Sequence, residues 1–365
     1  MQSVFLTLIV GLIETAVFVS ISKFLPKWMG AERHIWEDAG NYFLIVSIPI
    51  LFKAASTIFA SALRAVKDTK TPMIVNLGMN VLNIVLNFIL IYDTRTVFLG
   101  TKTVTIPGAG LGVIGAAVAT AISVTLGGIV MFIAFLRNPR IHLWGHRIYY
   151  KREIMSQCVR IGIPVAMERC TTSLGHVVFT GLVTGLGTVA FAAHSIAMTA
   201  EQAFYIPGYG LQGAVSTVVG NAIGERDLKK MKRQSWMFIG TAFIVMIMMG
   251  ALLFIFAPYV MAIFTKDSAV IAAGASALRI VAASEPIFGV MIMMEGIFHG
   301  AGDTKVPFIS SLVCMWGVRI CSTFIGVNFF GFDLNAVWIC MIVDNICRCT
   351  LMVIKFIRWD VSKIV

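Results

Sequence analysis

The chain has 365 residues, of which 58% are hydrophobic and 13% are charged, and its mean hydropathy is +0.88. A soluble globular protein carries charge on about a quarter of its residues, so this composition excludes a water-soluble fold. The formal net charge of +11 could indicate nucleic-acid binding. However, most lysines and arginines between the apolar runs fall in one alternating set of connections, which is typical of membrane topology. We therefore expect a lipid bilayer and no nucleic acid as a partner.

Ten apolar runs are each long enough to cross a bilayer, which takes about 20 residues of helix. Because lipid offers the backbone no hydrogen-bond partners, we expect every run to be helical. We interpret the sixth run as one long helix with a bend at Pro207. The runs lie near 4–22, 42–63, 73–92, 109–136, 159–183, 188–223, 236–263, 268–299, 306–330 and 334–357.

Two of the connections between these runs are longer than the others. Residues 93–108 are polar and contain Pro107, and we expect them to form an outer loop. Residues 137–154 carry five basic side chains, so the positive-inside rule places them, and both termini, in the cytoplasm. Part of this second connection is expected to form an amphipathic helix at the inner membrane surface.

A short motif occurs twice in the chain, each time at the end of an apolar run. Asp68-Thr69-Lys70-Thr71-Pro72 recurs as Asp303-Thr304-Lys305-Val306-Pro307. A repeat within an apolar chain indicates two copies of a multi-helix membrane unit, with binding sites near the bilayer midplane. We predict that both motifs are hinges or gates at the inner surface and do not contact substrate. Pro72 and Pro307 are expected to open the following helices as first-position prolines.

The fold class expected from these features is an all-α polytopic membrane protein with two pseudo-symmetric helical lobes. The second copy of the repeat holds six runs and the first holds four, whereas equal repeats would give twelve spans. We therefore expect either further sequence upstream of Met1 or a shortened protein. The predicted organisation is an N-terminal lobe at 1–136, a basic cytoplasmic connection at 137–154, a C-terminal lobe at 155–357 and a cytoplasmic tail at 358–365.

The segment 161–224 carries the most specific pattern in the chain. It contains Ile161-Gly162-Ile163-Pro164, Pro207-Gly208-Tyr209-Gly210 and Val219-Gly220-Asn221-Ala222-Ile223-Gly224. Together with the two Asp-Thr-Lys motifs, this pattern resembles the multidrug and toxic compound extrusion (MATE) family, although Asn221 stands where the family usually has Gln. The resemblance implies a drug exporter and covers the chain except for the family's first two helices. It also implies that the N-lobe proton-coupling Asp of many bacterial members has no assignable counterpart here.

Carboxylates within the predicted spans are candidates for ion coupling, because charge inside a membrane is costly and usually functional. Glu168 is the first candidate, since it follows Pro164 by one turn and a buried carboxylate can exchange a proton for a cation. Pairing with Arg169 is not favoured, because adjacent helical residues point about 100° apart. Glu285 and Glu295 share one span, and we expect at least one of them to take part in coupling, with Glu295 ahead. The family resemblance also implies a coupling carboxylate in this span.

Three pairs of opposite charge lie within reach of one another in the predicted helices. An acid four residues before a base is the favourable order on a helix, and Glu14 lies on the span next to that of Lys53. We expect all three to be structural ion pairs, and for Glu295 with His299 a proton relay is the alternative. The pairs are Glu295 with His299, Asp344 with Arg348, and Glu14 with Lys53.

Flexible and aromatic side chains near these acids predict a substrate cavity that accepts varied shapes. Glu201 and Gln202 precede the bend at Pro207, and both cavity contact and helix-packing hydrogen bonds remain open for them. We predict that Pro164 and Pro207 act as hinges. The further side chains predicted to contact substrate are Met167, Phe204, Tyr205, Tyr209, Met291 and Met294.

These observations predict an ion-coupled antiporter that exports amphipathic organic cations by alternating access between two lobes. We expect H⁺ or Na⁺ as the coupling ion, no other cofactor or metal, and a monomer in a cell membrane of the bacterial inner-membrane type. The sequence has no P-loop, dinucleotide fingerprint or H-E-x-x-H motif, so we expect neither an enzyme nor ATP-driven transport. Two alternatives remain. One is a lipid-linked saccharide flippase, disfavoured because its cavity would need several cationic residues, and the other is a non-transporting fragment.

Overall fold

The computed structural model describes residues 2–28, 33–99, 102–141 and 151–359. Helices account for nearly all of these residues, so the expected all-helical membrane fold is confirmed. The chain divides into two compact units, Met1–Met155 and Ser156–Val365. All ten predicted runs are helical, and the expected helix within 137–154 falls mainly on residues outside the described part.

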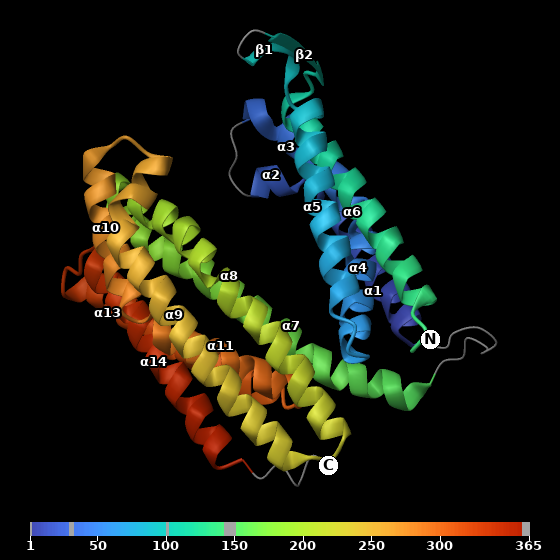
Figure 1. The fold of residues 1–365 in the computed structure, drawn as a ribbon. Helices are drawn as coiled ribbons and strands as arrows, with labels where there is room; N and C mark the ends of the chain where they lie inside the picture. Colours follow the sequence, from blue (N-terminus) through green and yellow to red (C-terminus); the bar gives the residue numbers. More distant parts are fainter. Residues whose placement is uncertain (1, 29–32, 100–101, 142–150, 360–365) are drawn as a thin grey trace. The chain divides into compact units, whose positions relative to one another are not determined.

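The first unit packs its helices around a small aromatic core (Figure 1). Phe59 stacks on Phe135 with ring centroids 4.7 Å apart, which joins the fourth helix to the sixth. Pro49 separates the third and fourth helices, which meet at 41°. The elements are α1 (Gln2–Ile21), α2 (Leu25–Trp28), η1 (Arg33–Ile35), α3 (Trp36–Ser47), α4 (Ile50–Ala65), α5 (Lys70–Leu90), β1 (Asp93–Leu99), β2 (Lys102–Ala109) and α6 (Gly112–Arg137).

The connection at 93–108, which is expected to be an outer loop, contains a β-hairpin. Strands β1 and β2 pair antiparallel over this segment, with Asp93 opposite Ala109 and Leu99 opposite Lys102. The segment is rich in Thr and Val, which favour extended backbone. A hairpin also lets the connection satisfy its own backbone hydrogen bonds.

The second unit is a larger bundle with two apolar cores (Figure 1). Helices α8 and α11 both pack along α9, and α14 packs against α11. As expected, residues 188–223 form one continuous helix with Pro207 inside it. The elements are α7 (Arg152–Thr184), α8 (Thr188–Gly224), α9 (Leu228–Phe264), α10 (Ser268–Ala282), α11 (Glu285–Gly300), α12 (Lys305–Leu312), the π-helix η2 (Val313–Ile320), α13 (Cys321–Phe329) and α14 (Leu334–Ile357).

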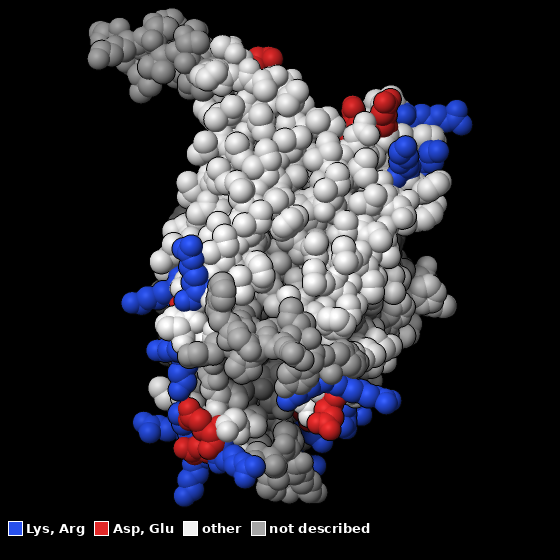
Figure 2. Space-filling view, turned by 90° about the vertical axis from the view of Figure 1, so that its right-hand side faces the viewer, with Lys and Arg blue, Asp and Glu red and all other residues white. Residues whose placement is uncertain are grey.

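Among the described residues, six helices are long and apolar enough to cross a membrane, or up to eight if each of two bent pairs is one span. Helices α7 and α8 have 33 and 37 residues but are not among them, because polar side chains interrupt their apolar character. In the view of Figure 2, the middle of the surface is largely free of charge. An uncharged surface of this kind can contact lipid. The polar side chains of α7 and α8 are costly to expose to lipid, so we expect them to face other polar groups inside the second unit.

The repeated motif forms the same backbone turn in both units. After α4 the amide of Asp68 donates to the carbonyl of Leu63 at 3.0 Å, and after α11 the amide of Asp303 donates to that of Phe298 at 3.0 Å. The residue before each Asp has a positive φ, 65° at Lys67 and 78° at Gly302, which is the usual way to end a helix. The sequence repeat is therefore also a structural repeat.

Candidate functional site

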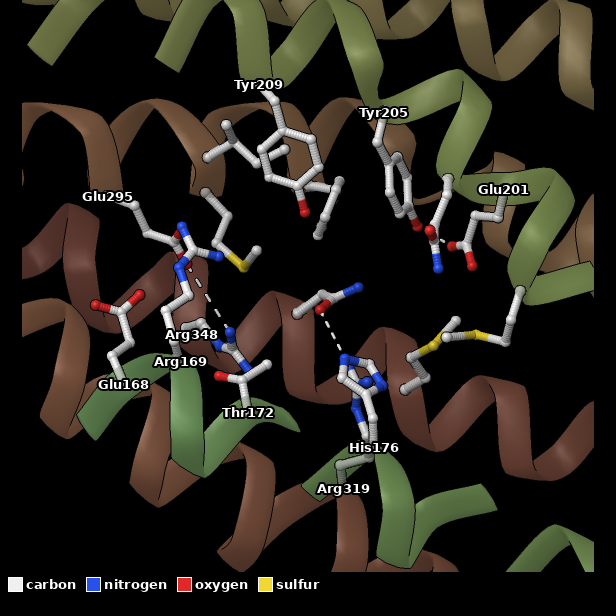
Figure 3. A pocket seen from close by; sticks show the side chains of 17 residues that line it. Glu168, Arg169, Thr172, His176, Glu201, Tyr205, Tyr209, Glu295, Arg319 and Arg348 are labelled. Atoms are coloured by element: carbon white, nitrogen blue, oxygen red, sulfur yellow. Dashed lines mark hydrogen bonds and ion pairs between the residues drawn. The ribbon is translucent and has the colours of Figure 1, made fainter. Parts of the chain in front are cut away.

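A cavity of about 370 Å³ lies inside the second unit (Figure 3). Its walls come from helices that are far apart in sequence, namely α7, α8, α11, η2 and α14. The cavity is lined by both signs of charge. Its charged side chains are Glu168, Glu201, Glu295, Arg169, Arg319 and Arg348.

One wall of the cavity is a single face of α8. Glu201, Tyr205 and Tyr209 follow one another at four-residue spacing, which places them on one side of a helix, and Figure 3 shows all three along the pocket. The hydroxyl of Tyr205 donates to the carboxylate of Glu201, and its ring packs on Phe288 with centroids 4.2 Å apart. Gln202 lines the cavity as well as Glu201. The hydrogen bond of Glu201 stays within α8, so the cavity contact expected for these two residues is seen, whereas this bond does not join two helices.

Glu168 is buried on α7 and lies beside His299 of α11. The Nε2 atom of His299 is 3.1 Å from the Oε2 atom of Glu168. No ion pair joins Glu168 to Arg169, as the helical geometry predicts. The expected pair of Glu295 with His299 is wrong, because the imidazole crosses to the neighbouring helix. Its partner is therefore the other carboxylate proposed for coupling.

Glu295 is buried on α11 and is held by two neighbouring helices. The Nε2 atom of Gln212 on α8 donates to its carboxylate at 3.0 Å, and the Nη1 atom of Arg348 on α14 lies 3.9 Å away. The close approach of α8 depends on Gly296, where a Cβ atom would lie 2.9 Å from the carbonyl oxygen of Gln212. Because Gly296 has no side chain, α8 can approach closely enough for Gln212 to donate to Glu295.

Behind the cavity wall, two arginines share one aspartate. Asp344 is fully buried, and its Oδ2 atom lies 3.4 Å from Nη2 of Arg348. The same oxygen is closer, at 2.7 Å, to Nη2 of Arg319, which also donates to Asn345 at 3.2 Å. The pair expected from spacing is thus part of a larger network that the sequence did not reveal. The available signal was an ionisable residue within a predicted span.

Arg319 lies in the π-helix η2, between α12 and α13. A π-helix inserts an extra residue into each turn and often marks functional sites. It shifts side chains away from the positions that a 3.6-residue period would give. The position of Arg319 in the sequence therefore does not predict that its side chain contacts Asp344 on α14.

Most of the other predicted site residues lie outside this cavity. Met167 is half-exposed, because Glu168 points inward and its neighbour turns about 100° away. Phe204 and Met294 pack in the apolar cores, whereas Met291 does line the cavity. Glu285 is buried at the bend between α10 and α11, and neither of its carboxylate oxygens has a hydrogen-bond partner.

Glu14 and Lys53 line a surface pocket of the first unit. The ion pair expected between them does not form, since the contacts of these two described residues include no salt bridge. Both side chains have at least partial access to the surface.

The two repeated motifs lie at helix starts, away from the cavity. Pro72 and Pro307 are each the third residue of a helix, α5 and α12, and not the first as expected. Their missing N–H groups still cause no loss, because the first turn has no intrahelical acceptor for them. Thr304 donates to the carbonyl oxygen of Ile161 on α7 at 3.1 Å. The predicted role of both motifs as hinges remains a prediction, as it does for Pro164 and Pro207.

Comparison with known proteins decides the family. The profile of the MatE family matches residues 1–89 and 164–325. The chain belongs to the MatE family. Its members are transporters and not enzymes, which agrees with the expectation from the sequence. The multi-pass membrane character expected from the apolar helices is confirmed as well.

Similar proteins are longer than this chain. A probable multidrug resistance protein NorM from Thermotoga maritima is 28% identical over 98% of this chain and 75% of its own length. An outward-facing multidrug resistance MATE transporter has a TM-score of 0.87 at 23% identity, covering 100% of this chain and 78% of its own. A MOP superfamily transporter from Pyrococcus furiosus, described as having a binding pocket of reverse polarity, has a TM-score of 0.85 at 23% identity and 99% and 77% coverage. At such identities the solved structures show the fold alone.

Proposed function

We propose that this protein is a multidrug efflux transporter that exports amphipathic organic cations in exchange for H⁺ or Na⁺. The observation that carries the proposal is the pair of buried carboxylates, Glu168 and Glu295, which reach one cavity from α7 and α11. A buried carboxylate that is neutralised either by the coupling ion or by the substrate cation, but not by both, supplies the exchange that an antiporter needs. The name of the Thermotoga maritima relative supports efflux.

The partners of the two acids are suited to reversible binding. The imidazole of His299 contacts Glu168 at 3.1 Å and is the only partner that the salt bridges of the described residues give this acid. Gln212 is neutral, and Arg348 approaches Glu295 only at 3.9 Å. Neither acid is therefore locked in a close ion pair with an arginine or lysine. Each remains free to exchange its counter-ion during a transport cycle.

Alternating access between two lobes is the transport mode that the repeat supports. Two copies of one unit, each ending a helix in the same turn, can exchange conformations about a site near the membrane midplane. The distribution of Lys and Arg favours cytoplasmic termini and a cytoplasmic 137–154 connection. Monomeric action, H⁺ or Na⁺ as coupling ion and the absence of other cofactors belong to the same proposal.

The alternative of a lipid-linked saccharide flippase needs reconsideration on one point. The expectation that the central helices lack cationic side chains is wrong, because Arg169, Arg319 and Arg348 all line the cavity. A pyrophosphate group carries several negative charges, however, and three glutamates line the same cavity. Like charges in a low-dielectric site repel strongly, so we retain export of cations as the proposed function.

The test is efflux of an ethidium-type cation from proteoliposomes under an imposed pH or Na⁺ gradient. Glu168→Gln keeps the side-chain shape but removes the exchangeable charge, so we expect gradient-driven export to fall at least tenfold, with normal insertion. Glu153→Gln is the matched control, because Glu153 lies on the same helix, is exposed and is not part of the cavity lining. Export by Glu168→Gln at the rate of the parent protein would contradict the proposal.

A further inference from the structure

A pocket separate from the cavity of Figure 3 lies beside the second copy of the Asp-Thr-Lys motif. Its volume is about 370 Å³, and its walls come from α7 and from the turn between α11 and α12. The charged side chains of its lining are Arg160, Asp303 and Lys305. Among the described residues, none of these three side chains takes part in a hydrogen bond or an ion pair. The pocket therefore presents charges of both signs that no other described side chain compensates.

The first copy of the motif shows which groups bind this turn when its own unit covers it. The Nδ2 atom of Asn138 donates to the carboxylate of Asp68 at 2.8 Å. The Nη1 atom of Arg140 donates to the carbonyl oxygen of Val66 at 2.7 Å. Two acceptors of the turn, one carboxylate and one carbonyl, are thus filled by nitrogen donors, one of which is cationic.

The second copy presents the same two acceptors without such donors. In the aligned motifs Asp303 takes the place of Asp68. Ala301 takes the place of Val66, and both residues of the second copy line the pocket. Within the described part of the chain, neither the carboxylate of Asp303 nor the carbonyl oxygen of Ala301 accepts a hydrogen bond. A cationic amine of a ligand would complete this turn as the donors of the first copy do.

Helices α7 and α12 run side by side from this pocket. The hydroxyl of Thr304 donates to the carbonyl oxygen of Ile161 at 3.1 Å. Further along both helices, the hydroxyls of Thr172 and Ser311 lie 3.0 Å apart, so the two helices run in the same direction. The start of α7 follows the basic connection 137–154, and basic connections lie at the membrane surface. The pocket is therefore at the level of the lipid headgroups.

Each cation of the pocket is followed by an exposed apolar side chain on the same helix face. Ile163 follows Arg160 by three residues on α7, which makes them neighbours on the helix surface. Ile309 follows Lys305 by four residues on α12 and is its neighbour in the same way. Both isoleucines are exposed. A basic pocket with apolar surface leading away from it is suited to a phospholipid, whose phosphate lies at the membrane surface and whose chains extend inward.

We propose that this pocket binds the headgroup of a phospholipid that carries a primary amine beside its phosphate, of which phosphatidylethanolamine is the simplest. The phosphate lies between Arg160 and Lys305, because guanidinium and ammonium groups both bind phosphate oxygens. The amine donates to the carboxylate of Asp303 and to the carbonyl oxygen of Ala301. The acyl chains follow the apolar surfaces of α7 and α12. The site is independent of the exported substrate and of the coupling ion.

The test is binding of defined lipids to the full chain, which is stripped of lipid in detergent and measured by native mass spectrometry. Phosphatidylethanolamine is compared with phosphatidylcholine, which has the same chains, phosphate and net charge but no N–H donor. We expect phosphatidylethanolamine to bind about tenfold more tightly, as a charge-assisted hydrogen bond provides. Glycerophosphoethanolamine and inorganic phosphate carry no acyl chains, so each should bind at least about tenfold more weakly than the lipid.

Four variants separate the two halves of the site. Arg160→Gln removes one partner of the phosphate and should weaken the binding of both lipids by about tenfold or more. Arg152→Gln is the matched control, because Arg152 is also exposed on α7 and is not part of the pocket lining. Asp303→Asn removes only the charged partner of the amine, so phosphatidylethanolamine should fall to the affinity of phosphatidylcholine. Lys305→Gln removes the other cation and gives a second reading if Arg160→Gln does not insert.

Three results would overturn the site. The first is equal binding of the two lipids that Arg160→Gln does not change. The second is equal weakening by Arg152→Gln and Arg160→Gln, which would mean a general effect of surface charge. The third is a soluble phosphate ester that binds as tightly as the lipid, because such binding needs no acyl chains. None of these results affects the proposed export of cations, which the efflux assay tests separately.

Discussion

The two copies of the Asp-Thr-Lys motif share a backbone turn but differ in their side-chain contacts. Asp68 accepts hydrogen bonds from the amide and hydroxyl of Thr71, at 3.1 and 2.9 Å, and from Asn138 at 2.8 Å. In the second copy Val306 replaces Thr71, and Asp303 makes no side-chain hydrogen bond within the described chain. Each motif therefore sets its turn through backbone geometry, whereas its side-chain contacts depend on the surrounding helices.

Thr69 and Thr304 show the same dependence on neighbours. Thr304 is 2% exposed and donates to the carbonyl oxygen of Ile161 on α7. Thr69 is exposed, and no side-chain hydrogen bond to it is seen within the described residues. The same residue in the same turn is thus buried in one unit and open in the other.

The larger difference between the units is where buried charge lies. In the described part of the first unit the buried polar side chains are all Ser or Thr, whereas the second unit buries carboxylates and guanidinium groups. The ionisable chemistry of the described chain is therefore concentrated in the second unit. Substitutions of acids should affect the two units very differently.

The largest expected effect is the loss of Asp344, which two buried arginines share. Asp344→Asn leaves both guanidinium groups without their common counter-charge, so we expect a loss of about 3–5 kcal/mol in unfolding free energy. Glu14→Gln in the first unit is the comparison, since Glu14 has no salt bridge there, and it should change stability by less than about 0.5 kcal/mol. Thermal unfolding in lipid nanodiscs measures both. Equal effects would remove the distinction between the units.

A smaller effect is expected from helix packing at Gly296. A Cβ atom at this position would lie 2.7 Å from Cγ1 of Val215 on α8, so Gly296→Ala should cost about 1–3 kcal/mol through overpacking. It should also weaken the contact between Gln212 and Glu295. The control is Gly78→Ala on α5, where a Cβ atom meets nothing within 4 Å. An equally destabilising change at Gly78 would contradict this interpretation.

The smallest expected effect concerns the two repeated aspartates. Asp68→Ala removes three hydrogen bonds at the start of α5 and should cost about 1 kcal/mol, whereas Asp303→Ala removes none within the described chain. We expect both variants to reduce turnover while substrate binding stays nearly intact, as hinge residues should. Paired measurements of unfolding, binding and transport rate test this. Loss of substrate binding in either variant, at normal protein levels, would assign the motif to the binding site.

The sequence predicted the helices and several cavity acids because both follow from local rules. Apolar length identified the spans, and the cost of charge within a span pointed to Glu168 and Glu295, which both line the cavity. Sequence could not tell which helices face each other, so His299 was paired with Glu295 when its partner is Glu168.

The positions of Arg319 and Arg169 could not be predicted from the spacing of residues along the sequence. Arg319 lies in the π-helix Val313–Ile320 and contacts Asp344, and apolar periodicity does not distinguish a π-helix from an α-helix. Arg169 lines the cavity, although its sequence position beside Glu168 indicates only that the two side chains do not pair. The packing of the helices against one another determines where both arginine side chains lie.

The central claim is that one set of carboxylates in the second unit holds the coupling ion and the substrate cation in turn. The most direct measurement is ion release when octyltrimethylammonium is added to the protein in nanodiscs, followed by a pH indicator or by a ²²Na⁺ binding assay. We expect the parent protein to release close to one H⁺ or one Na⁺ for each cation bound. The double variant Glu168→Gln/Glu295→Gln should release none. Full cation binding by the parent protein without release of either ion would contradict the account.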